Sequence, residues 1–126
     1  MGELSSFSPS DVHATYANWQ SVLFYSEQLL RGRRAKDPLE WLMDDVYDMS
    51  SSVHSLSRSP LRDVLFDAER AAVDDVHHAA TEFLASEGRS DPGTIFSAAD
   101  HFVRVTGETI GNDSAEVFEL LRYWAR

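Results

Sequence analysis

The chain has 126 residues and no cysteine, and its 21 acidic and 11 basic side chains give a formal net charge of −10. This length fits one domain with a hydrophobic core, and the lack of cysteine excludes disulfides and thiolate metal sites. The negative charge disfavours direct binding of nucleic acids and of anionic membranes. Because the sequence shows no signal segment and no long apolar run, we expect a cytoplasmic protein that binds no membrane.

Most of the helix starts are marked by a capping residue followed by proline, which gives up only an N–H that has no partner there. These pairs are Ser8-Pro9, Asp37-Pro38, Ser59-Pro60 and Asp91-Pro92, and a capping box follows at Asp113-x-x-Glu116. Glycines suited to helix ends stand at Gly32, Gly88 and Gly111. The sequence therefore predicts an all-α, single-domain bundle at 9–126 after a flexible N-terminus at 1–8. Its helices, about five, are expected at 9–31, 38–57, 60–87, 93–110 and 114–125.

The hydrophobic residues recur every three or four positions, as they do in helices that pack on a core. The first helix is apolar over a wide arc, which predicts a central helix with neighbours on several sides. Its apolar residues are Val12, Tyr16, Trp19, Val22, Leu23, Leu29 and Leu30. The second helix has a narrow seam at Leu39, Leu42, Val46, Met49, Val53 and Leu56. The third has a stripe at Leu61, Leu65, Ala68, Ala72, Val76, Ala79 and Phe83. The rest of the core is expected at Ile95, Ala99, Phe102, Val103, Val117, Leu120, Leu121 and Trp124.

The second helix carries an acidic line opposite its apolar seam. At about 100° per residue, this line consists of Glu40, Asp44 and Asp48, and Trp41 and Tyr47 flank it on either side. The simplest interpretation is a solvated face. However, stacked carboxylates repel one another, and acids beside aromatic rings suit the recognition of an arginine- or lysine-rich protein surface. We therefore predict that these five residues bind a partner.

A second candidate acidic face lies on the third predicted helix, where Asp63, Asp67 and Asp74 point outward and His78 lies nearby. The same helix carries Asp75-x-x-His78-x-x-x-Glu82, which imitates half of a carboxylate-bridged metal site. Such a site needs a matching Glu-x-x-His helix. Because His13, His54 and His101 lack an acid at the required spacing, the sequence predicts no metal and no other cofactor.

The basic residues concentrate in one segment, Arg31-Gly32-Arg33-Arg34-Ala35-Lys36. Cations are favourable at the end of a helix, and the segment lacks the glycine-rich geometry of a phosphate loop. We interpret it as a helix end that can pair with acids of the next helix start.

No catalytic motif occurs in the sequence, and ten of the eleven basic residues are arginine, which hints at a bacterial or phage source. We predict a non-enzymatic inhibitor that occupies a basic, nucleic-acid-handling protein partner, as immunity proteins, antitoxins and phage-encoded anti-defence inhibitors do. One alternative is a metal-dependent all-α hydrolase that uses acids of the second and third helices. A further alternative is a structural or regulatory module that forms homodimers through exposed aromatic residues.

Overall fold

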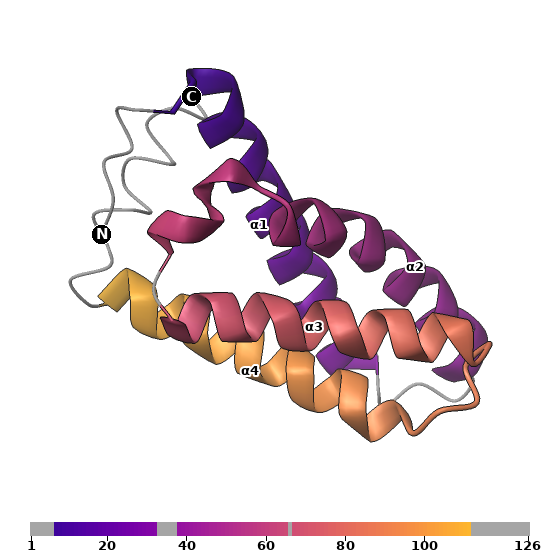
Figure 1. The fold of residues 1–126 in the computed structure, drawn as a ribbon. Helices are drawn as coiled ribbons and strands as arrows, with labels where there is room; N and C mark the ends of the chain where they lie inside the picture. Colours follow the sequence, from indigo (N-terminus) through magenta and orange to yellow (C-terminus); the bar gives the residue numbers. More distant parts are fainter. Residues whose placement is uncertain (1–6, 33–37, 66, 112–126) are drawn as a thin grey trace.

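A computed structural model describes residues 7–32, 38–65 and 67–111, with side chains described there except at positions 9, 32, 38–42, 64 and 108–111. These residues form four α-helices, α1 (Pro9–Gly32), α2 (Pro38–Ser57), α3 (Asp67–Ala85) and α4 (Pro92–Gly111), and one 3-10 helix, η2 (Pro60–Val64). No strand occurs in these ranges, so the described chain is all-α (Figure 1). The helices expected at 9–31, 38–57 and 93–110 are confirmed, and the one expected at 114–125 lies outside the described residues.

The four α-helices pack in a ring, α1 on α2, α2 on α3, α3 on α4 and α4 back on α1. Figure 1 shows α3 and α4 side by side, with α1 running obliquely from above them to behind α3. Helix α1 also contacts η2, so three elements pack against it, in line with its wide apolar arc. At the edges of this arc Tyr16 and Leu23 are partly buried, and Phe24 is 56% exposed.

Three helix starts are capped as the sequence predicts. Ser8 Oγ accepts a hydrogen bond from Asp11 N at 3.1 Å, and Asp91 Oδ1 accepts one from Gly93 N at 2.9 Å. At the start of η2, Ser59 Oγ accepts one from Leu61 N at 3.1 Å. The end of α3 is also as expected, because Gly88 has a left-handed φ of 80° and donates from its N–H to Phe83 O at 2.9 Å. Of the segment 1–8, Phe7 packs against the core, and residues 1–6 lie outside the described part of the chain.

The single helix expected at 60–87 is wrong, because the chain breaks into η2 and α3. Leu65, at the end of η2, has an extended backbone with φ −74° and ψ 153°. This extended step changes the phase of the following helix. Ala68, expected in the core, is exposed, whereas Glu69 is only 1% exposed.

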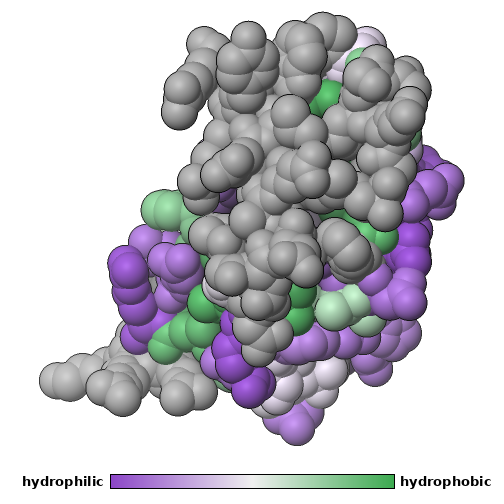
Figure 2. All heavy atoms as spheres, turned by 90° about the vertical axis from the view of Figure 1, so that its left-hand side faces the viewer, coloured by the Kyte–Doolittle hydropathy of each residue, from purple (hydrophilic) through white to green (hydrophobic). Residues whose placement is uncertain are grey.

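The core lies along the inner faces of all four helices, and Trp19 of α1 is among its largest fully buried side chains. Its indole ring lies 4.8 Å from the Phe102 ring of α4, and its Nε1 donates to Thr106 Oγ1 at 3.2 Å. Hydrophilic side chains cover much of both visible flanks at one end of the bundle, with hydrophobic ones between them (Figure 2). The burial of the apolar side chains leaves the hydrophilic faces of the helices on the outside, where a partner can contact them.

Candidate functional site

The acidic face of α2 points away from the core in its described part. Val46 and Met49 are fully buried, so the opposite side of the helix carries Asp44 and Asp48 into solvent, where both are exposed. Tyr47 lies beside them and is 71% exposed, more than any other large hydrophobic side chain in the described ranges. The side chains of Glu40 and Trp41 lie outside the described part of the chain. The described part of the predicted site therefore consists of Asp44, Tyr47 and Asp48.

Asp45 adds a carboxyl group that the sequence did not single out. It is partly buried at the edge of the α2 seam, and its Oδ2 atom is buried with no hydrogen-bond partner. Burial raises the pKa of Asp45, and the negative charges of Asp48 and Asp44 raise it further. The position of Asp45 between the acidic line and the apolar seam could have indicated its partial burial from the sequence. Whether its Oδ2 atom finds a hydrogen-bond donor depends on packing, which the spacing of apolar residues does not predict.

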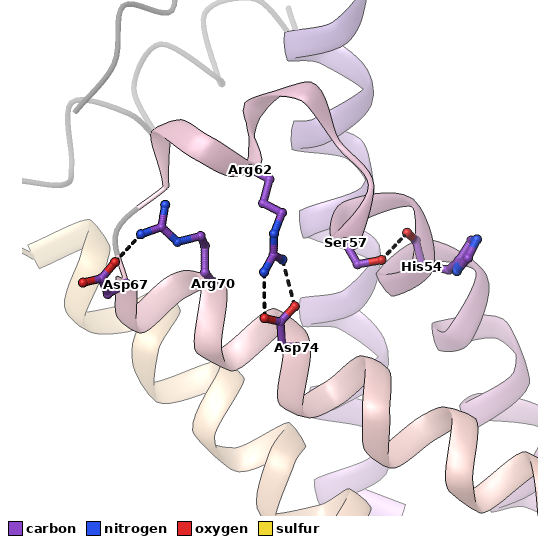
Figure 3. A network of polar contacts seen from close by, with 6 residues as sticks. All are labelled: His54, Ser57, Arg62, Asp67, Arg70 and Asp74. Atoms are coloured by element: carbon purple, nitrogen blue, oxygen red, sulfur yellow. Dashed lines mark hydrogen bonds and ion pairs between the residues drawn. The ribbon is translucent and has the colours of Figure 1, made fainter.

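Among the described residues, neither Asp44 nor Asp48 forms an ion pair. The carboxylates of α3 differ in this respect (Figure 3). Asp74 accepts hydrogen bonds from Arg62 Nη1 and Nη2 at 2.8 and 2.7 Å, and these bonds lower the pKa of Asp74. Asp67 pairs with Arg70 one turn along the helix. Within the described residues, the chain thus compensates these two α3 charges and provides no ion pair for Asp44 or Asp48.

The second candidate face does not form one helical line, because the break at Leu65 places Asp63 in η2 and the other aspartates in α3. Asp63 is exposed. His78 is also exposed, and its Nε2 atom lies 3.6 Å from Glu82 Oε2. This face is therefore divided between two elements and is the weaker candidate for binding a basic surface.

An open groove of about 680 Å³ runs between α3 and α4. It is lined by Asp75, His78, Ala79, Asp91, Gly93, Thr94, Ser97, Ala98 and His101. His101, which lacks an acid at helical spacing in its own segment, lies with its Nδ1 atom 3.5 Å from Asp75 Oδ2 of the neighbouring helix. The described residues nevertheless contain no group of three or more His, Asp or Glu side chains that could hold a metal ion.

The basic segment predicted at 31–36 is described only at its start. The Nη2 atom of Arg31 lies 3.7 Å from Glu27 Oε2, one turn back in α1, and residues 33–36 lie outside the described ranges. Within those ranges, no helix combines the length and apolar character required to cross a membrane. Comparisons with models of protein families, with curated proteins and with solved structures find no match to this chain.

Proposed function

We propose that the protein is a non-enzymatic binding protein that uses Asp44, Tyr47 and Asp48 of α2 to bind a basic protein partner. The observation that carries the proposal is the 71% exposed Tyr47 beside two exposed carboxylates. Tyrosine is enriched among the residues that dominate interface energies, since its ring buries a large area and its hydroxyl keeps a polar contact. Exposed carboxylates attract arginine and lysine during encounter and fix the orientation of the complex.

The lack of ion pairs at Asp44 and Asp48 within the described residues favours this face over α3. A partner that pairs with Asp74 must first compete with Arg62, whereas no described side chain forms an ion pair with Asp44 or Asp48. Asp45 supports the same choice, because its carboxyl group lies close enough to Asp44 and Asp48 for the three negative charges to act on one another.

The partner class follows from the chemistry of such a surface. Carboxylates arrayed along a helix offer arginine and lysine side chains the same kind of ligand that nucleic-acid phosphates offer. A protein of this charge therefore competes for the basic residues of a nuclease or another nucleic-acid-handling protein. We propose that it acts as an inhibitor of that kind, as immunity proteins, antitoxins and phage-encoded inhibitors do.

The test is a differential capture from a lysate of the cells that encode the protein. Three baits are compared: the wild type, Asp44→Arg with Asp48→Arg, and the control Asp100→Arg, which lies on α4, diagonally opposite α2 in the ring. The expected result is one basic protein retained by the wild type and the control and lost from the α2 double variant. Binding of the recombinant pair should then weaken as salt rises from low to physiological strength.

Two results would refute the proposal. In one, the α2 double variant is well folded by circular dichroism and retains every protein that the wild type captures. In the other, the captured protein is lost equally from the Asp100→Arg control, which would show that net charge and not the α2 face determines binding.

A further inference from the structure

Two histidines from neighbouring helices meet at the surface of the bundle. The Nδ1 atom of His54 in α2 lies 3.4 Å from the Nε2 atom of His77 in α3. The ring centroids are 5.4 Å apart, with planes tilted by 56°. His54 is exposed and His77 is partly buried. A nitrogen of each ring therefore points toward the same small region, which is open to solvent.

The separation of these nitrogens matches that of two ligands of one tetrahedral metal ion. Zinc–nitrogen bonds of about 2.0–2.1 Å and a tetrahedral angle place two histidine nitrogens about 3.3–3.4 Å apart. The observed 3.4 Å is long for a direct N–H···N hydrogen bond. The two rings therefore stand at the spacing that a shared ion requires, and without an ion they form only a long hydrogen bond.

A carboxylate close to His77 is already engaged by another side chain. Asp74, one turn before His77, is held by Arg62. No third protein ligand joins the two rings among the described residues, so water would complete the coordination.

We propose that His54 and His77 form a two-histidine site for a borderline transition-metal ion, Zn²⁺ being the clearest candidate, that links α2 to α3. This site is distinct from the α3 motif of Asp75, His78 and Glu82. It lies on the α2–α3 side of the ring, whereas the groove that contains His78 lies between α3 and α4. Imidazole is a good ligand for zinc and a poor one for the hard cation Mg²⁺.

The experiment titrates the full chain, without a polyhistidine tag, with ZnCl₂ and in parallel with MgCl₂. Isothermal titration calorimetry should give one Zn²⁺ per chain. Zinc at about tenfold above its dissociation constant should raise the melting temperature by roughly 5 °C. In either His54→Gln or His77→Gln, the affinity for zinc should fall at least tenfold, the loss that even an outer partner of a metal ligand produces.

The controls are His78→Gln and His101→Gln, which alter the α3–α4 groove and should leave the affinity for zinc unchanged. Both His54 and His77 are accessible to solvent, so their glutamine variants should fold normally, which circular dichroism verifies. The proposal is overturned if zinc fails to stabilise the wild type or if Mg²⁺ has the same effect. It is also overturned if binding survives in both glutamine variants or is lost in a groove control.

Discussion

Arg62 of η2 holds Asp74 of α3 with two hydrogen bonds, from Nη1 to Oδ1 at 2.8 Å and from Nη2 to Oδ2 at 2.7 Å. The pair spans the extended step at Leu65 that divides the two helices (Figure 3). A guanidinium matches a carboxylate at both oxygens, which fixes direction as well as distance. The pair therefore sets the angle at which the chain enters α3.

The first prediction concerns the contribution of this pair to stability. Replacing Arg62 by methionine should lower the free energy of unfolding by about 1 kcal/mol, or roughly 3–5 °C in melting temperature. The estimate is modest because the Arg62 and Asp74 side chains are 32% and 51% exposed. Asp67→Asn is the control, since Asp67 is 96% exposed in its pair with Arg70 and should not change the melting temperature.

The same pair should give an acid-dependent component of stability. Arg62 lowers the pKa of Asp74 below its ordinary 3.8. The pair therefore contributes fully above pH 3.8, and its contribution is lost as the pH falls through the lowered pKa. Chemical denaturation of the wild type and Arg62→Met at several pH values should show the difference at pH 6 and its disappearance in strong acid. If the wild type and Arg62→Met still differed by the same free energy of unfolding at pH 2, the ion pair would not be the source of the difference.

Asp45, unlike Asp74, should lower the stability of the fold at neutral pH. Its pKa is raised by burial and by Asp48 and Asp44, so the ionised form destabilises the fold above the raised pKa, and this cost disappears as the pH falls toward 3.8. Asp45→Asn should therefore stabilise the protein at neutral pH by about 1 kcal/mol, the order of cost of an unsatisfied buried acceptor.

His77 gives a third pH-dependent prediction. Burial and His54 lower its pKa from the ordinary 6.5, so the folded protein resists a proton that the unfolded chain accepts. In the absence of metal, stability should therefore fall as the pH drops below 6.5 toward the lowered pKa. His77→Gln should flatten this slope. Equal slopes in wild type and His77→Gln would contradict the prediction.

The sequence predicts the helices best where local chemistry determines the backbone. Ser8-Pro9 and Asp91-Pro92 mark the starts of α1 and α4, because a cap and a proline act within one turn. Periodicity failed at Leu65. Leu61 and Leu65 are four residues apart and both buried, as in a continuous helix, although the backbone at Leu65 is extended. An apolar pattern cannot distinguish these two ways of burying the same side chains.

The candidate site was predictable only where it depends on a single helix. Helical spacing places Asp44, Tyr47 and Asp48 on the outer face of α2, and the structure has all three exposed. The spacing of residues within a helix does not predict contacts between helices. The approach of His54 to His77 and the pairing of His101 with Asp75 depend on which helices become neighbours and in what register. No spacing within one helix contains that information.

The last prediction separates the roles of ring and charge on α2. Tyr47→Ala should leave the melting temperature unchanged, because a substitution at a 71% exposed side chain alters little packing. In a complex anchored by this ring, the same change should speed dissociation about 30-fold, equivalent to ~2 kcal/mol. Asp44→Arg with Asp48→Arg should mainly slow association, and it should remove the salt dependence of the association rate.

Phe24→Ala is the matched control, since Phe24 is 56% exposed on α1 and should affect neither rate. Surface plasmon resonance at two salt concentrations measures both rates. Equal effects of Tyr47→Ala and Phe24→Ala would show that the tyrosine is no anchor.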